Sequence, residues 1–186
     1  MNKVFVSSLF VALLLLSYFP VYANVFGFNL QNGIDVIYTW NHSTATTHIN
    51  DEIKYAKENW EYPGWWNPID FVAKSTNSST NMDFWAYPAA YFDEGVVAYT
   101  QFYQTAYRPV SPNSEDWYWC KISFNYEDPA SYYIRKGTII HEIGHALGLA
   151  HRNSTPSSIM CQRSYGRTVQ TVQYSDNLNL LNLYGY

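Results

Sequence analysis

Charge and cysteine are both scarce in this sequence. Charged residues make up 14% of its 186 residues and the formal net charge is -4, so the chain lacks the basic surface of a protein that binds nucleic acid. Two cysteines are too few for a small fold built on disulfides. Hydrophobic residues, in contrast, make up 47% of the chain and aromatic residues 19%, which excludes a disordered chain and indicates a packed core.

Residues 1–23 have the pattern of a secretory signal peptide. A nearly continuous apolar run from Val4 to Leu16 is followed by Val21-Tyr22-Ala23, which places small residues before a cleavage site. The alternative is an uncleaved membrane anchor, but a membrane-spanning helix needs about 20 apolar residues and this run is shorter. We therefore expect a secreted, extracellular protein whose mature part, residues 24–186, is a single domain without a membrane partner.

The hydrophobic pattern of the mature part predicts five strands and three helices. Alternation of apolar residues predicts strands, and apolar residues spaced by three or four predict helices. The strands are expected at residues 35–40, 69–73, 82–87, 95–102 and 121–125, and the helices at 44–60, 130–147 and 176–183. Residues 108–114 contain two prolines and are predicted to be a loop. This order of elements indicates an α+β domain with helices packed on one sheet.

Aromatic residues are concentrated between Phe84 and Trp119. Such a stretch can line a cleft or form a platform that binds sugars, or it can fill the core and pack on a sheet. We favour packing, because aromatic side chains tend to be buried.

The residues that carry chemistry lie in the run His141-Glu142-Ile143-Gly144-His145. Side chains at i and i+4 share one face of a helix, so both imidazoles can bind one Zn²⁺. Glu142 lies on the adjoining side, from where its carboxylate can act on water. An ordinary amphipathic helix can also carry this pattern, so these residues alone do not establish a metal site.

Gly148 and His151 make the pattern more specific. Glycine adopts the left-handed conformation at a helix end at little cost, so Gly148 is suited to end the helix. The chain can then turn and return His151 as a third ligand. Three histidine ligands leave a fourth position open, as in catalytic rather than structural zinc sites. The sequence therefore predicts one catalytic zinc ion held by His141, His145 and His151.

The run from His141 to His151 resembles the extended zinc signature HExxHxxGxxH of the metzincins. Residues 156–160 resemble the Met-turn of that clan, which implies that Met160 lies beneath the zinc without binding it. Within the metzincins the chain is similar to the matrixins, because residues 95–99, 122–125 and 137–140 look like their edge strand, fifth strand and active-site helix. The resemblance implies a twisted, mostly parallel five-stranded sheet with three helices and an active-site cleft.

The resemblance also implies an activity, that of a zinc-dependent metalloendopeptidase acting on protein or peptide substrates. Glu142 would be the general base for a water activated by zinc. Gly148 and Met160 would support the site. Val97 and Ala98 of the edge strand would pair with an extended substrate. We expect a monomer that binds neither nucleic acid nor, after removal of the signal peptide, a membrane.

The chain departs from the matrixin pattern at a second metal site. Tyr99 and Ser123 stand where matrixins carry histidines for a structural zinc, so we expect only the catalytic zinc. Glu127 and Asp128 leave calcium binding open. Two further functions also stay open: that of a catalytically silent relative that keeps zinc and binds a protein or a glycan, and that of a peptidase of narrow specificity.

Cys120 and Cys161 are a candidate disulfide. Export would place them in an oxidising compartment, where a free thiol is exposed to oxidation. They could instead be two free thiols, or one of them could be held near the metal.

Overall fold

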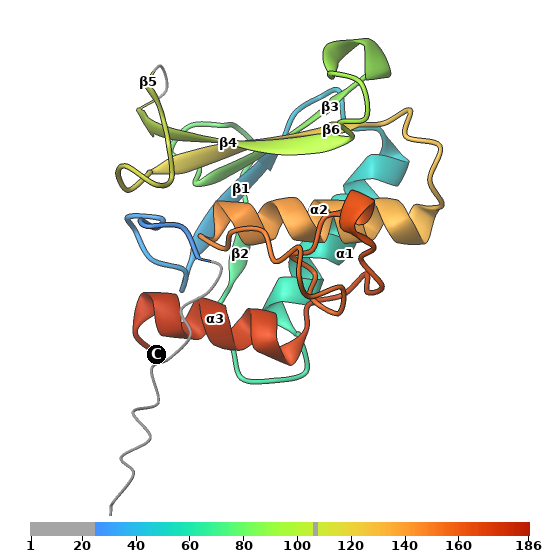
Figure 1. The fold of residues 1–186 in the computed structure, drawn as a ribbon. Coiled ribbons are helices and arrows are strands. Elements are labelled where there is room, and N and C mark those ends of the chain that lie inside the picture. The colour runs from blue at the N-terminus through green and yellow to red at the C-terminus, as the bar shows by residue number, and fades with distance from the viewer. Residues whose placement is uncertain (1–24, 106–107) are drawn as a thin grey trace, which may run out of the picture.

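A computed structural model of the chain describes residues 25–105 and 108–186. Its elements are β1 (Ile37–Asn41), α1 (Thr47–Glu61), β2 (Phe71–Ala73), β3 (Met82–Tyr87), η1 (Ala89–Tyr91), β4 (Ala98–Thr105), β5 (Arg108–Val110), β6 (Trp119–Asn125), α2 (Tyr132–Ala146), η2 (Arg163–Tyr165) and α3 (Tyr174–Tyr184). The sheet forms one layer and the three helices lie on one of its sides (Figure 1). The predicted signal peptide, residues 1–23, lies outside the described residues.

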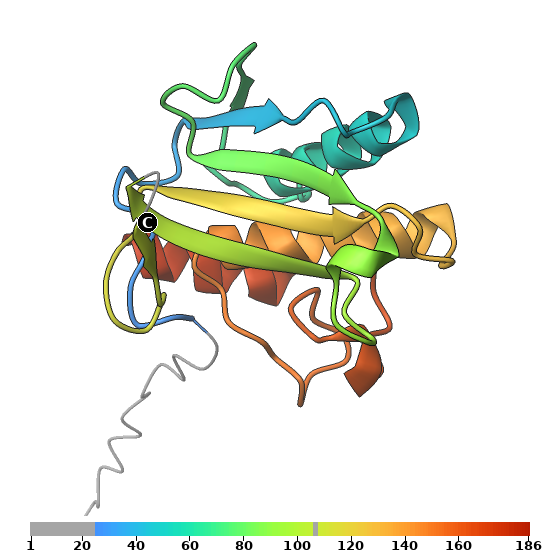
Figure 2. The ribbon, with the colours of Figure 1, turned by 90° about the horizontal axis from the view of Figure 1, so that it is seen from above.

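The sheet has the strand order β2-β1-β3-β6-β4-β5 (Figure 2). The pairs β1–β2, β1–β3 and β3–β6 are parallel, whereas β4 is antiparallel to both β6 and β5. The predicted α+β fold with a mostly parallel sheet and three helices is thus confirmed.

The predicted number of strands was wrong, because the sheet has six. The additional strand, β5, lies in the proline-containing stretch for which a loop was predicted. Its Pro109 pairs with Tyr103 of β4, and β5 is the last strand of the sheet. A proline lacks the N–H that a second neighbour would need, and at an edge there is no second neighbour.

The two sides of the sheet differ in composition, because alternate residues along a strand face opposite sides. The side toward the helices is buried and apolar; on β3 and β6 it consists of Met82, Phe84, Ala86, Cys120, Ile122 and Phe124. Helix α2 packs under this side, against β4, β6 and α1. Two buried indoles fix its position, since Trp60 donates to Ile140 O at 2.9 Å and Trp117 donates to Ala146 O at 3.1 Å.

Helix α2 has clear signals at both ends. The side chain of Ser131 accepts a hydrogen bond from Ile134 N at its start. At its end Gly148 has a φ of +104°, and Leu149 N donates to Gly144 O at 2.9 Å. This closing bond across a left-handed glycine satisfies a carbonyl that the helix leaves free. A Cβ at Gly148 would lie 2.5 Å from Leu183 Cδ2 of α3, the end of a side chain that can shift, so the positive φ is the stronger reason for glycine.

The aromatic stretch is divided between the core and the outer side of the sheet. Phe84, Phe102 and Trp117 are buried in the core. On the outer side Trp85 stacks on His42 at 3.7 Å between ring centroids, and on Tyr87 at 6.0 Å. Because these flat ring faces contact each other, the arrangement supports packing rather than a free sugar-binding platform.

The predicted disulfide is wrong for this structure, in which both cysteines are free. Cys120 lies on the inner side of β6, where its Sγ is 3.9 Å from Ala146 O of α2. Cys161 packs in the loop after Met160, with its Sγ 3.7 Å from Tyr165 O. The two buried thiols face different neighbours, which the spacing of two cysteines along the chain cannot reveal.

The helices of the described residues do not meet the requirements of a membrane span, since none is both long and apolar enough to cross a bilayer.

One acidic side chain on the outer side of the sheet is buried. Asp83 of β3 is 4% exposed and accepts a hydrogen bond from Thr80 Oγ1 at 2.6 Å. Burial raises the pKa of Asp83 to about 6, although the Thr80 hydroxyl and the Lys121 charge act in the opposite direction.

We therefore predict that Asp83→Asn stabilises the protein at high pH. The folded-state pKa lies above the unfolded value, so ionised Asp83 opposes folding above pH 6, and this cost disappears as the pH falls toward 4. Comparison of urea unfolding curves should show a gain of about 1–3 kcal/mol at pH 8 and almost none at pH 4. Equal gains at both pH values would contradict the prediction, and Asp51→Asn on the exposed side of α1 is the matched control.

Candidate metal centre

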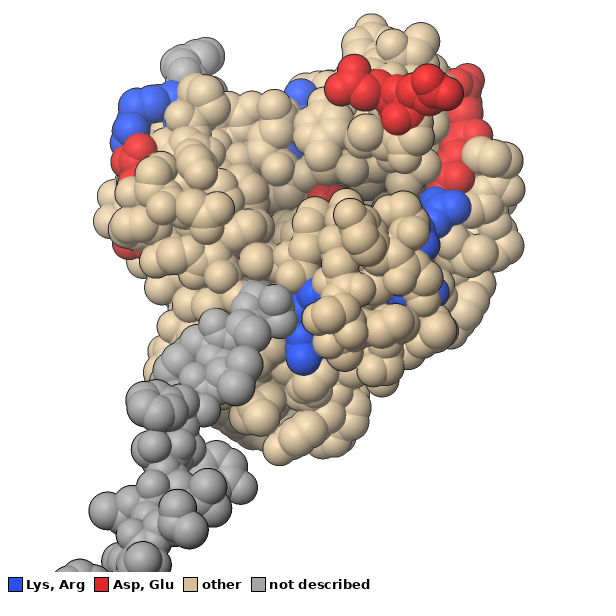
Figure 3. All heavy atoms as spheres, in the orientation of Figure 1, with Lys and Arg blue, Asp and Glu red and all other residues tan. Residues whose placement is uncertain are grey.

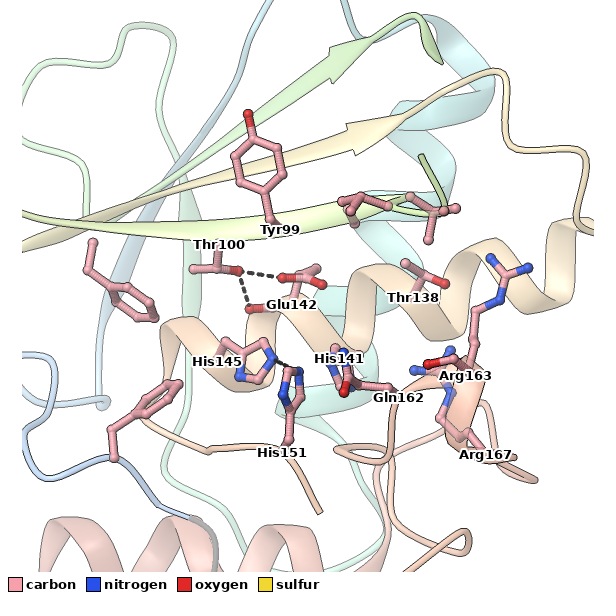
Figure 4. Close-up of a pocket in the computed structure, with 17 residues that line it drawn as sticks. Tyr99, Thr100, Thr138, His141, Glu142, His145, His151, Gln162, Arg163 and Arg167 are labelled. Carbon is pink, nitrogen blue, oxygen red and sulfur yellow. Dashed lines mark hydrogen bonds between the residues drawn. The ribbon is translucent and has the colours of Figure 1, made fainter. Parts of the chain in front are cut away.

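Three imidazoles converge below β4. Helix α2 presents His141 and His145 one turn apart, and the turn at Gly148 returns the chain so that His151 joins them (Figure 4). One ligand atom from each of the three histidines lies within 4.8 Å of the others, and the Nε2 atoms of His145 and His151 are 3.0 Å apart. The structure thus brings together the three residues that the sequence predicted as metal ligands.

Backbone carbonyls orient two of these rings. His141 Nδ1 donates to Ile159 O at 2.8 Å, and His145 Nδ1 donates to Leu149 O at 2.7 Å. Since a carbonyl only accepts, the proton of each ring is on Nδ1 and the lone pair of Nε2 is free for a metal.

The electrostatics of the three histidines also fit a metal. Burial lowers the pKa of all three imidazoles, in His145 to about 3, and for His141 and His145 the neighbouring histidines add to the effect. The rings are therefore neutral at pH 7, which is the form that binds metals. Three neutral imidazoles close together are a donor set suited to zinc, with a further coordination position left over.

Glu142 lies on the cleft side of α2, next to the three histidines (Figure 4). Its carboxylate is 6% exposed, and burial raises its pKa to about 7. The hydroxyl of Thr100 in β4 lies 2.8 Å from Glu142 Oε2 and 3.0 Å from Glu142 O, to which it can donate. Sequence reasoning missed Thr100, because strand alternation predicts which side of the sheet it faces but not which helix residue it meets.

A cavity of about 750 Å³ contains these groups. It lies between residues 95–100 on one side and α2 with the loop after Met160 on the other. In the space-filling view a groove crosses this side of the molecule below the sheet, and most of its rim carries no charged group (Figure 3). Of the three histidines in this cavity, His151 is exposed to solvent.

The two predicted substrate-binding residues of the edge strand, Val97 and Ala98, differ in how their main-chain groups are used. Val97 O accepts a hydrogen bond from Asn125 N at 2.8 Å, so this carbonyl is already used inside the sheet. Ala98 is the next residue, and in an antiparallel pair the main-chain groups of successive residues point to opposite sides. Strand β5 pairs only from Phe102 onward, so in the described residues the open side of β4 at Ala98 has no partner strand.

The side chain of Met160, in the segment that resembles a Met-turn, packs against α2. A Cβ at Gly144 would lie 2.4 Å from Met160 Sδ, so the helix is in close contact with this side chain between its two histidines. Both Met160 and the neighbouring Ile159 are fully buried. The close contact explains why a glycine stands at this position of the helix.

A buried carboxylate holds this turn in place. Asp176, in the first turn of α3, accepts hydrogen bonds from Ser158 Oγ at 2.5 Å and from Ile159 N at 2.9 Å. Arg152 Nη1 lies 3.5 Å from the same carboxylate. Because Ile159 O in turn orients His141, Asp176 supports the metal centre without touching it. Nothing in the local sequence around Asp176 indicated this role.

The acidic residues considered for calcium are engaged by other groups. Glu127 Oε2 accepts a hydrogen bond from Ala89 N at 2.8 Å, and Asp128 forms a 2.7 Å ion pair with Arg163. These contacts give calcium binding no support, and the three-histidine cluster is the only group of potential metal ligands found among residues 25–105 and 108–186.

The family model described as Matrixin matches residues 36–185, which include both the sheet and the three histidines. No curated protein matches the chain significantly.

We predict that Asp176→Ala destabilises the protein and weakens zinc binding. The change leaves the Ser158 hydroxyl and the Ile159 N–H buried without an acceptor, so urea unfolding should show a loss of about 2–4 kcal/mol. Zinc affinity, measured by competition with a chelating dye, should fall about 10- to 100-fold because Ile159 no longer orients His141. Asp51→Ala, on the exposed side of α1, should change neither quantity, and equal behaviour of the two variants would refute this role for Asp176.

Proposed function

The chain belongs to the matrixin family, and from this premise we propose that it is a secreted zinc metalloendopeptidase in which Glu142 is the general base. The family relationship indicates a metallopeptidase that uses zinc and acts on proteins or peptides. The observation that carries the finer proposal is the position of the Glu142 carboxylate, which faces the same cavity as the three histidines.

In this proposal His141, His145 and His151 hold the zinc ion. Zinc, when bound, supplies a Lewis acid that polarises the scissile carbonyl and makes water a better nucleophile. The main-chain carbonyls of Leu149 and Ile159 keep two of the ligands in the required tautomer and orientation. The three ligand atoms are already grouped within 4.8 Å of one another, which favours binding of one ion.

Glu142 moves the protons of the reaction. Its carboxylate accepts a proton from the attacking water and passes it to the nitrogen of the leaving amine. Burial raises the pKa of the Glu142 carboxyl and so favours the uptake of a proton from water. The Thr100 hydroxyl at Oε2 fixes the orientation of the carboxylate.

The substrate would lie in the cavity as an extended chain along β4. The free side of the strand at Ala98 offers main-chain groups for antiparallel pairing, which places a peptide bond above the histidines. Val97 would contribute by holding this edge to β6 rather than by pairing with substrate. An endopeptidase needs a cleft open at both ends, and the groove in Figure 3 is consistent with that requirement.

We predict that Glu142→Gln removes peptidase activity and leaves zinc binding intact. The amide keeps the shape of the side chain but cannot accept the proton, so kcat on a quenched-fluorescent peptide library should fall about 10²- to 10⁴-fold. Zinc content should remain one ion per chain, whereas His151→Ala should lose both zinc and activity. Undiminished cleavage by Glu142→Gln would refute the role of Glu142, and zinc binding without cleavage by the wild type would favour a silent relative.

The proposal of secretion has its own test. Expression of the full chain in a secretory host should yield an extracellular protein. Its intact mass should match a chain that begins at Asn24, because residues 1–23 are removed. Size-exclusion chromatography of this product should give a monomer. Retention in the membrane with an intact N-terminus would instead establish the uncleaved anchor.

A further inference from the structure

Arg167 is a cation in the cavity without an acidic partner. The other arginines of the described residues form ion pairs, namely Arg108 with Glu115, Arg135 with Glu52, Arg152 with Asp176 and Arg163 with Asp128. No ion pair to Arg167 is found among residues 25–105 and 108–186. It therefore brings to the wall of the cleft a positive charge that no ion pair within these residues balances.

The contacts of this guanidinium do not satisfy it. Arg167 Nη1 donates to Ile159 O at 3.4 Å and Nη2 donates to Gln170 Oε1 at 3.2 Å, and both acceptors are neutral. Its Nε is buried and has no hydrogen-bond partner in the described structure. A guanidinium has five N–H groups, and removing it from water is favourable only when an anion compensates its charge.

The surroundings of Arg167 favour an anion from outside the chain. Figure 4 shows Arg163 and Arg167 near Thr138, on the side of His141 away from His145. The lining there is polar and includes Gln162 and Ser164, while Glu142 is the one carboxylate among the described residues that line the cavity. Glu142 and Arg167 attract each other across the cavity but form no ion pair, so no carboxylate of the described residues contacts the guanidinium.

We propose that Arg167 binds a carboxylate of the substrate next to the scissile bond and makes the peptidase selective for it. This inference rests on the proposed peptidase function and names the class of substrate. A planar guanidinium can hold a carboxylate by two parallel, charge-assisted hydrogen bonds. A neutral amide forms a much weaker interaction with the same group. The carboxylate can belong to an aspartate or glutamate side chain, or to the C-terminus of a short peptide.

The test compares matched peptides on the wild-type protein. In the first pair, one peptide carries Glu and the other Gln at a position beside the cleaved bond, and each such position is tested. In the second pair, the residue after the cleaved bond is the last one and ends in a free carboxylate in one peptide and in an amide in the other. The wild type should show a kcat/KM about 10- to 100-fold higher for the acidic member of one pair, which identifies the source of the carboxylate. No preference for either acidic member would overturn the proposal.

Variants then assign the preference to one residue. Arg167→Gln should reduce the ratio of kcat/KM for the acidic peptide to kcat/KM for its neutral match to about 1–2. Arg167→Lys keeps the charge but not the planar guanidinium, and should give an intermediate ratio. Arg108→Gln removes one positive charge from β5, outside the cavity, and should leave the ratio unchanged. A full preference in Arg167→Gln, or its loss in Arg108→Gln, would overturn the assignment to Arg167.

Binding distinguishes this inference from the proposed function. Calorimetry with zinc-loaded Glu142→Gln protein, with and without Arg167→Gln, should show tighter binding of the acidic peptide only when Arg167 is present. If the wild type cleaves no peptide but this difference is found, the peptidase function fails and the carboxylate site stands. If peptides are cleaved but neither rates nor affinities depend on the carboxylate, the site fails and the peptidase function stands.

Discussion

Two backbone carbonyls, those of Leu149 and Ile159, fix the orientation of the imidazoles on which the candidate metal centre depends. Each accepts the Nδ1 proton of one histidine, so the Nε2 atoms of His141 and His145 are left to converge with His151. Both carbonyls belong to segments outside α2, and their positions therefore follow from how the chain leaves the helix. The turn at Gly148 places Leu149, and the Met-turn places Ile159.

The rest of the fold holds these two segments against α2 from below and covers the helix from above. Asp176 of α3 binds the Met-turn through Ser158 Oγ and Ile159 N, which connects the last helix of the chain to the ligand His141. Above the helix, Thr100 of β4 reaches the Glu142 carboxylate. Groups far apart in sequence thus orient His141 and Glu142, and such fixed orientations are what a preorganised catalytic site requires.

The sequence predicted the parts of this arrangement that depend on local spacing. Each of these patterns spans only a few neighbouring residues. They are the i, i+4 pair of histidines, the glycine that ends α2 and the alternation of apolar residues along each strand. Thr100 and Asp176 could not be predicted, because each acts through a partner more than ten residues away. Arg167 could not be predicted either, because its role follows from the lack of an ion pair, which only the fold shows. For the same reason the disulfide was wrong: composition suggested two thiols in an oxidising compartment, but only the fold shows that Cys120 faces α2 and Cys161 does not.

The departure from the matrixin pattern at Tyr99 and Ser123 has a structural counterpart. These residues pair with each other across β4 and β6, at the positions where the resemblance implies histidines for a structural zinc. On the same side of the sheet the rings of Trp85 and Tyr87 stack, and Lys121 Nζ lies 4.6 Å and 5.2 Å from their centroids. Ring stacking and cation–π contacts hold a sheet surface together without a metal. Side-chain packing therefore stabilises this side of the sheet, whereas the three histidines that could bind a metal lie below β4.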